Sequence, residues 1–173
     1  MIKYAKSYSL DKNINLLDDN LTVRKEVIYQ PKKTLVFMKA IIEHFIKHPD
    51  PMVVPVYSFE IIKESELGNN TYAYTMMRLG ILSETEKQLI DFVGDLHDSY
   101  DAAACLQEMF YPGQDIHPKL FNFLKTVVEQ RRYWDIHSGN ILMDSDGNYR
   151  LIDLEGFLRT PLILNCVVDF ISG

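Results

Sequence analysis

Three polar residues in the second half of the chain have types and spacing that suit phosphoryl transfer. Asp135 and Asn140 lie on a loop before a short apolar run, and Asp153 follows a second such run. Between the runs, Asp146 and Gly147 are a strong short-range signal for a β-hairpin. If the turn is centred between these two residues, Asn140 and Asp153 lie opposite each other, with Cβ atoms roughly 5 Å apart.

An amide oxygen and a carboxylate at that separation suit Mg²⁺, which accepts a few protein oxygens and keeps its other positions for water and phosphate. Asn140 and Asp153 are therefore the expected metal ligands, and a nucleotide would complete the shell. Asp135 remains as the carboxylate that can orient or deprotonate an attacking hydroxyl group. The neighbouring acids Asp144 and Asp146 are expected to be solvated turn residues.

The segment DIHSGNILMDSDGNYRLIDLEG, residues 135–156, resembles the catalytic loop and metal-binding segment of the protein-kinase-like superfamily. In that superfamily an Asp is followed by an Asn five positions later and by a second Asp eighteen positions later, and all three match here. The resemblance implies that Asp135 is the catalytic base and that Asn140 and Asp153 hold Mg²⁺.

The resemblance also implies how the N-terminal part holds ATP. Lys25 is the candidate for the strand lysine that binds the α- and β-phosphates, and Glu43 in the following helix is its candidate partner. Lys33 and Lys39 compete with Lys25. Strand alternation turns one of Arg24 and Lys25 inward without deciding which. Backbone contacts to adenine are implied for Met76, Met77 and Leu79.

The chain departs from protein kinases at several positions. Tyr133 and Trp134 stand where protein kinases usually have His-Arg, so activity should not need a phosphorylated activation loop. Residues 1–67 contain no glycine, which removes the usual glycine-rich phosphate cover. His137 resembles the DLHPGN loop of aminoglycoside and choline phosphotransferases and joins the expected catalytic residues. The alternative role for His137 is a hydrogen bond that stabilises the loop.

The elements that position these residues fall into two parts, with the boundary near Gly80. Residues 1–79 are expected to form a small antiparallel sheet with one helix, the N-terminal lobe. Apolar residues at helical spacing predict that helix between Pro31 and His48, and the turn signal at residues 68–70 predicts a hairpin after it.

Residues 80–173 are expected to be mainly helical outside the metal-binding hairpin. A capping box at residues 83–86 begins the first helix, and two more are predicted over 101–110 and from His117. The fold class is therefore α+β. The resemblance implies a two-lobed protein-kinase-like fold with a reduced C-terminal lobe, because only residues 157–173 follow the hairpin.

Composition limits the classes of partner. The 173 residues are 47% hydrophobic and 24% charged, with net charge −6, which predicts a globular protein without a broad basic surface for nucleic acid. No run of about 18 apolar residues is present to span a membrane, and two cysteines without metal-ligand spacing predict neither zinc nor disulfides. We expect a cytoplasmic protein, in the host cytoplasm if it is an effector or viral protein.

The leading hypothesis for the function is a minimal Ser/Thr kinase that uses ATP and Mg²⁺ and acts on a protein. Its size resembles the miniature kinases of secreted bacterial effectors and phages. One alternative is a kinase for a small hydroxylated metabolite or antibiotic, as in aminoglycoside and choline kinases. Another is a pseudokinase-like module that sequesters a partner protein. The reduced C-terminal lobe also predicts an apolar surface covered by a second copy or a partner.

Overall fold

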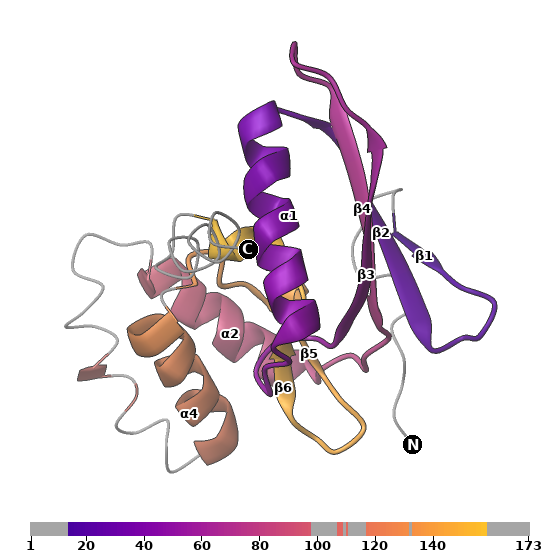
Figure 1. Cartoon of the computed structure of the whole chain (residues 1–173). Coiled ribbons are helices and arrows are strands. Elements are labelled where there is room, and N and C mark those ends of the chain that lie inside the picture. Colours follow the sequence, from indigo (N-terminus) through magenta and orange to yellow (C-terminus); the bar gives the residue numbers. More distant parts are fainter. Residues whose placement is uncertain (1–13, 98–106, 109, 111–116, 132, 159–173) are drawn as a thin grey trace.

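The computed structural model describes residues 14–97, 107–108, 110, 117–131 and 133–158. These residues form an α+β protein, which confirms the expected class. A four-stranded antiparallel sheet carries a long helix along one face, and two further helices and a two-stranded sheet lie at one end of it (Figure 1). No helix within the described residues is long and apolar enough to cross a membrane.

The larger sheet is antiparallel throughout, with the strand order β1-β2-β4-β3. Its strands are β1 (Ile14–Leu16), β2 (Thr22–Gln30), β3 (Val56–Lys63) and β4 (Asn70–Met77). Strand β4 is central and mostly buried, whereas β3 forms an exposed edge. The turn between them contains Gly68 (φ +97°) and Asn69 (φ 61°), two residue types that favour left-handed conformations. The predicted hairpin is confirmed.

Helix α1 (Lys32–Lys47) packs along one face of this sheet (Figure 1). Pro31 lies just before its first turn, where the fixed φ of proline fits the helix and no backbone donor is lost. The helix ends at His48, next to Pro49. The helix predicted between Pro31 and His48 is confirmed, and its buried residues are Leu35, Met38, Ala40, Ile41, Ile42 and Phe45.

The second part contains α2 (Glu84–His97), α4 (Pro118–Thr126) and a π-helical turn that continues α4 (Val127–Arg131). The predicted capping box begins α2. The backbone N–H of Ser83 donates to Glu86 Oε1 at 3.1 Å, and the N–H of Glu86 donates to Ser83 Oγ at 3.2 Å. The helix predicted from His117 is confirmed, whereas the one predicted over 101–110 lies largely outside the described residues.

The second sheet is a hairpin of β5 (Ile141–Met143) and β6 (Tyr149–Leu151). Its turn has three residues, 145–147, because the backbone N–H of Asp144 donates to Asn148 O at 2.9 Å. Gly147 takes φ +79° at the last turn position, the conformation that a three-residue hairpin loop requires there. Asp146 and Gly147 are therefore the last two residues of the loop and do not flank its centre.

This turn shifts the strand register by one residue from the expected one. Asn140 faces Ile152, whose backbone N–H donates to Asn140 O at 3.0 Å. The expectation that Asn140 and Asp153 lie directly opposite each other is wrong, because the loop has one residue more than a two-residue turn.

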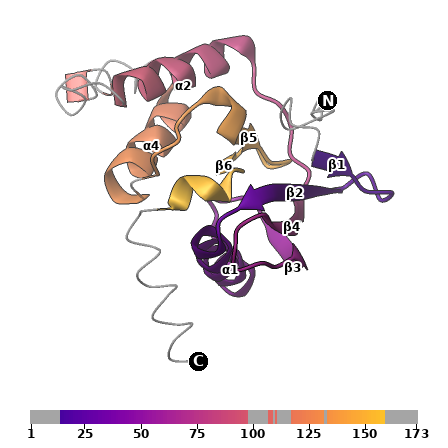
Figure 2. The same cartoon turned by 90° about the horizontal axis from the view of Figure 1, so that it is seen from above.

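The short hairpin is bonded to both ends of the β3–β4 unit. Gly80 and Met143 exchange two backbone hydrogen bonds of 2.8 and 3.0 Å. Leu151 accepts a hydrogen bond from the N–H of Val54 and donates one to Met52 O, both at 2.8 Å. Viewed from above, the hairpin lies between the four-stranded sheet and the helices α2 and α4 (Figure 2). The division into two lobes at Gly80 stays a prediction, since these bonds join the two parts directly.

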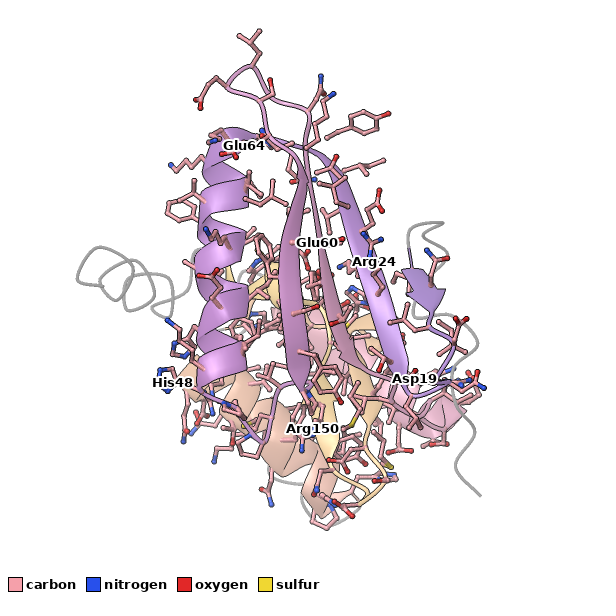
Figure 3. The ribbon with its side chains drawn as sticks, turned by 45° about the vertical axis from the view of Figure 1, so that its right-hand side comes forward. Asp19, Arg24, His48, Glu60, Glu64 and Arg150 are labelled. Carbon is pink, nitrogen blue, oxygen red and sulfur yellow. The ribbon has the colours of Figure 1, made fainter. Side chains whose placement is uncertain are left out.

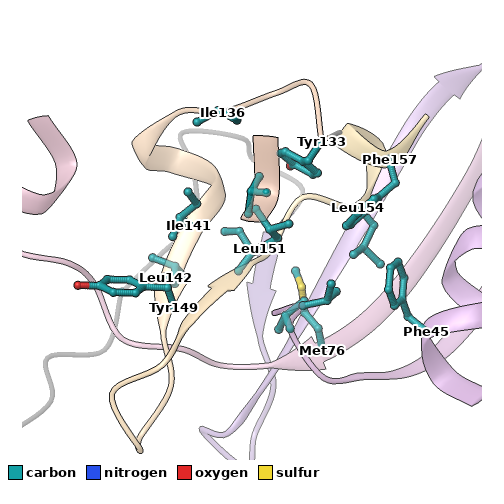
Figure 4. Packing of buried hydrophobic residues seen from close by; sticks show 14 of the residues in the cluster. Phe45, Met76, Tyr133, Ile136, Ile141, Leu142, Tyr149, Leu151, Leu154 and Phe157 are labelled. Atoms are coloured by element: carbon teal, nitrogen blue, oxygen red, sulfur yellow. The ribbon is translucent and has the colours of Figure 1, made fainter. Parts of the chain in front are cut away.

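One hydrophobic core runs through both parts of the described chain. Where they meet, the ring of Phe157 lies 5.1 Å from that of Phe45 and 5.0 Å from that of Tyr133, measured between centroids (Figure 4). Phe157 ends a 3₁₀ helix (Leu154–Phe157) that directly follows Asp153. Core packing thus fixes the segment after Asp153 from two sides.

Asp144 is buried, so the expectation that it is a solvated turn residue is wrong. Its carboxylate accepts hydrogen bonds from two backbone N–H groups of the turn and from Arg150 Nε, each at 2.9 Å. Arg150 also donates to the carbonyl groups of Asp50 (3.1 Å) and Val53 (2.9 Å). Asp146 is exposed, as expected. Asp144 therefore fixes the turn and, through Arg150, ties β6 to the segment before β3.

We expect Asp144→Ala to lower the free energy of unfolding by about 2–4 kcal/mol. The substitution removes the ion-pair partner of the largely buried Arg150 and the acceptor of two backbone hydrogen bonds in the turn. The exposed substitution Asp146→Ala should change it by less than about 0.5 kcal/mol. Urea denaturation followed by circular dichroism measures both. Equal effects of the two substitutions would show that the Asp144 network does not hold the hairpin.

Candidate functional site

The loop before β5 brings Asp135, His137 and Asn140 together. Asn140 Nδ2 donates to the backbone oxygen of Asp135 at 3.0 Å and to its Oδ2 at 2.9 Å. His137 Nε2 lies 3.7 Å from the same Oδ2, and His137 Nδ1 accepts a hydrogen bond from the N–H of Gly139 at 3.0 Å. The loop-stabilising role considered for His137 is therefore present.

The hydrogen bonds between Asn140 and Asp135 leave the amide oxygen of Asn140 available to another ligand. Both of its hydrogen bonds to Asp135 use the amide nitrogen, and no described residue donates a hydrogen bond to the amide oxygen. Asn140 also accepts, through its backbone oxygen, the hydrogen bond from Ile152, the residue before Asp153. The two predicted metal ligands are thus on adjoining positions of the hairpin, although they do not face each other.

Helix α2 supports this loop from behind. Asp91 accepts two hydrogen bonds from Ser138, one from its N–H at 2.6 Å and one from its hydroxyl group at 2.9 Å. Three residues later, a Cβ atom on Gly94 would lie 2.0 Å from the carbonyl oxygen of Ile136. Sequence reasoning missed both residues, because their helical spacing acquires meaning only once the loop is known to pack against α2.

A second group of charges forms where β2 passes the segment after β6. Lys25 Nζ lies 3.1 Å from Asp153 Oδ1 and 3.0 Å from Glu155 Oε2. Only 15% of the Lys25 side chain is exposed, with 25% for Asp153 and 21% for Glu155. The structure therefore brings the predicted phosphate-binding lysine to a predicted metal ligand 128 residues away.

The direction of strand β2 decides between Lys25 and its neighbour. Arg24 points to the opposite face of the sheet, away from α1, and pairs there with Glu26 at 3.0 Å and Glu60 at 2.7 Å (Figure 3). Lys25 is the inward residue of the two.

Glu43 on α1, the expected partner of Lys25, does not pair with it. No ion pair joins Glu43 to Lys25 among the described residues, and both ion pairs of Lys25 go to Asp153 and Glu155. The predicted Lys25–Glu43 pair is absent, because α1 turns Ile42 and Phe45 into the core rather than Glu43. Glu155, which the sequence analysis did not single out, pairs with Lys25 instead.

Three tyrosines surround the carboxylates. The hydroxyl groups of Tyr72 and Tyr74 donate to Glu155 at 2.8 and 3.2 Å, and that of Tyr133 donates to the backbone oxygen of Asp153 at 2.6 Å. Burial first, and then the neighbouring carboxylates, raise the pKa of all three tyrosines, so they stay protonated donors. Sequence reasoning missed them, although alternation in β4 places Tyr72 and Tyr74 on one face.

The two carboxylates have opposite pKa shifts. Burial raises the pKa of Asp153 to about 7, and the nearby Glu155 adds to this effect more than Lys25 offsets it. Burial of Glu155 is outweighed by the charge of Lys25 and by hydrogen bonds from Asp153 and Tyr72, so its pKa falls to about 2. Burial also opposes the charge of Lys25, but the carboxylates raise its pKa. Glu155 is therefore ionised at neutral pH, whereas a further cation near Asp153 would favour its ionised form.

The segment after β4, residues 78–80, is called the linker here and borders a cleft of about 230 Å³. The cleft is lined by Leu21, Tyr57, Met77, Arg78, Leu79, Gly80, Met143 and Ser145. Two predicted adenine-binding residues, Met77 and Leu79, line this cleft, whereas Met76 is buried in the core. The backbone N–H of Met77 already donates to Pro55 O at 2.9 Å. A base in this cleft would have to use other groups of the linker.

The described residues contain no group of three or more His, Cys, Asp or Glu side chains arranged to hold a metal. The candidate pair of Asn140 and Asp153 differs from such a group, since it offers one amide oxygen and one carboxylate. This donor set fits Mg²⁺, which keeps several positions for water and phosphate oxygens. It does not fit zinc, which takes three or four nitrogen, sulfur or carboxylate ligands from the protein.

The contact between α2 and the loop predicts an unusual sign for a helix substitution. Gly→Ala inside a helix ordinarily stabilises by about 1 kcal/mol. Gly94→Ala should instead destabilise by about 1–3 kcal/mol, because its Cβ meets the Ile136 carbonyl group. Differential scanning calorimetry measures the change, with the exposed Asp95→Ala on the same helix as control. A higher melting temperature for Gly94→Ala would contradict the close contact.

The raised pKa of Asp153 predicts a pH-dependent stability of the metal-free protein. Its pKa of about 7 lies above the ordinary value of 3.8, so ionising Asp153 opposes folding above pH 7, and this penalty fades as the pH falls towards 4. Asp153→Asn should therefore raise the melting temperature at about pH 8, by an amount that shrinks towards about pH 5.

Thermal unfolding in EDTA across this pH range tests the prediction for Asp153. The exposed Asp146→Asn serves as the control, and its difference from the unsubstituted protein should not change with pH. If the gain in melting temperature from Asp153→Asn were larger at acidic than at alkaline pH, the pKa of Asp153 would be lowered in the folded protein and not raised.

Comparison with known proteins assigns this chain to no family. No protein-family model matches it, and no curated protein sequence matches it.

Proposed function

We propose that this protein is a phosphotransferase that uses ATP and Mg²⁺, and that its acceptor is a hydroxyl group on a protein. The observation that supports it most is the meeting of Lys25 with Asp153 at 3.1 Å, beside the loop in which Asn140 is hydrogen-bonded to Asp135. A cation, an oxygen pair suited to a metal and a further carboxylate are the groups that phosphoryl transfer needs.

Each side chain has a separate task in this proposal. Asp135 receives or orients the acceptor hydroxyl, and its contacts with Asn140 and His137 hold the carboxylate in place for that task. Asp135 is partly exposed, at 31% of its side chain, so an acceptor can approach it. Lys25 supplies the positive charge for the nucleotide phosphates.

Asn140 and Asp153 would hold Mg²⁺, and Lys25 would hold the nucleotide phosphates. When bound, these groups supply the transferable phosphoryl group and neutralise its charge. The protein provides the rest by placement, since Lys25, Asp135 and Asp153 come from three separate segments that the common core holds together. A cytoplasmic setting, where ATP is available, goes with this proposal.

Exposed aromatic residues favour a protein as the acceptor over a small molecule. Trp134, directly before Asp135, is 51% exposed, and Phe92 on α2 is 54% exposed, next to the Asp91 that holds the loop. A contiguous exposed apolar patch rimmed by polar residues marks a surface where another protein binds. Such a protein would be the substrate, a partner or a second copy of the chain.

A second candidate is a pseudokinase-like binding module, and two observations favour it. The cleft at the linker, about 230 Å³, is smaller than the roughly 300–1,000 Å³ of typical ligand pockets. The backbone N–H of Met77, a donor expected to contact adenine, is already used within the fold. A module of this kind would bind a partner protein without transferring phosphate.

Binding and transfer can be separated with two substitutions. Mg²⁺ with ATP at 100 times its Kd should stabilise the unsubstituted protein by about 2.7 kcal/mol, and Asp153→Ala should abolish this stabilisation. Asp135→Ala should keep the stabilisation but slow transfer by about 10²–10⁴-fold. The exposed Asp146→Ala should keep both.

Transfer of labelled phosphate to lysate proteins is compared with transfer to a panel of aminoglycosides and choline-like alcohols. Label on proteins supports the proposed acceptor, and label on the small molecules would move the acceptor class to metabolites or antibiotics. Stabilisation by Mg²⁺ and ATP without transfer to either would favour the binding module. The absence of any stabilisation would overturn the nucleotide site.

A further inference from the structure

Both carboxylate oxygens of Glu155 have hydrogen-bond or ion-pair partners. Its Oε2 lies 3.0 Å from Lys25 Nζ and 3.2 Å from the hydroxyl group of Tyr74, and its Oε1 accepts from Tyr72 at 2.8 Å. Both carboxylate oxygens are thus held by donors from the central strands. Three donors therefore hold this carboxylate in one position.

The strand pairing leads Lys25 to this carboxylate. Lys25 and Tyr74 are direct neighbours across β2 and β4, and the ammonium group lies 5.9 Å from the centre of the Tyr74 ring. The stem of the lysine therefore runs beside the same tyrosine whose hydroxyl group holds Glu155. This arrangement gives Lys25 little freedom to point elsewhere.

The backbone next to Glu155 is also fixed, through its packing against Tyr133. The next residue, Gly156, lies so close to Tyr133 that a Cβ atom would come within 2.1 Å of the ring. Tyr133 in turn donates to the backbone oxygen of Asp153 at 2.6 Å. Glu155 is therefore held from the backbone as well as from its side chain.

The charges do not balance in the group as it stands. One ammonium group faces two carboxyl groups, those of Asp153 and Glu155, which leaves a net charge of −1 when both are ionised. In the proposed function Asp153 is also a metal ligand, so its carboxylate cannot serve Lys25 alone. Glu155 does not share that task, because Lys25 and the tyrosines already contact both of its carboxylate oxygens.

We infer that Glu155 is the positioning residue for Lys25, and that it keeps the ammonium group aimed at the nucleotide phosphates when Asp153 serves the metal. This inference rests on the proposed function. It assigns to a residue on the segment after β6 the task that the sequence had led us to expect from Glu43 on α1.

The accessibility of Lys25 tests this role without any nucleotide. The rate at which an amine-reactive ester modifies Lys25 is followed by mass spectrometry, with the exposed Lys63 as internal standard. Glu155→Gln should raise the rate at Lys25 by about tenfold, because the ammonium group loses one of its two ion pairs and becomes more accessible. Glu43→Gln should leave the rate unchanged.

Kinetics supply the second measurement. Glu155→Gln should raise the KM for ATP by about tenfold, with a smaller change in kcat, since Lys25 would no longer be prepositioned for the phosphates. Glu60→Gln is the matched control, because Glu60 pairs with Arg24 on the opposite face of the same sheet. If Glu155→Gln folds poorly, Tyr72→Phe removes one donor to Glu155 and should shift both measurements two- to threefold in the same direction.

The outcomes distinguish this inference from the proposed function. Faster modification of Lys25 in Glu155→Gln, together with a raised KM, supports the inference. Equal or larger effects of Glu43→Gln would overturn it. If the unsubstituted protein binds no Mg²⁺ and ATP, the proposed function fails, and an unchanged modification rate in Glu155→Gln would reject the ion pair itself.

Discussion

An ammonium group shared by two carboxylates holds strand β2 against the segment that follows β6. Lys25 reaches across 128 residues of sequence to Asp153 and 130 to Glu155, in a region where water is mostly excluded. Removing Lys25 would leave Asp153 and Glu155 without their cation in that region, which is far more unfavourable than losing a surface pair. The positions of the sheet and the loop relative to each other therefore depend on this contact.

The surroundings of the pair are built to keep it in place at some expense in stability. Tyr72 and Tyr74 donate to the Glu155 carboxylate, and the core packs Phe157 against both Phe45 and Tyr133 just beyond it. Yet burial raises the pKa of Asp153 to about 7, so ionising this carboxyl group is unfavourable. A fold selected for stability alone would place an apolar residue there, and a retained acid in such a place is typical of functional sites.

Local patterns in the sequence predicted the elements well and their long-range contacts poorly. Helical periodicity located α1, and Ser83 with Glu86 located the start of α2, because both signals depend on neighbouring residues. The Asp146–Gly147 signal identified the hairpin but not its register, since the same pair also fits the end of a three-residue loop. Alternation could not choose between Arg24 and Lys25, because the choice depends on carboxylates more than a hundred residues away.

The paired backbone hydrogen bonds at Gly80 bear on how the molecule can move. An enzyme that opens and closes between two parts usually bends at its linker. Here the linker residue is itself part of a small ladder with Met143, and Leu151 is bonded to the segment on the other side of the same unit. Bending at residue 80 would break this ladder, so in the proposed function substrates would enter and products leave through side-chain rearrangement or motion of the sheet's outer edge.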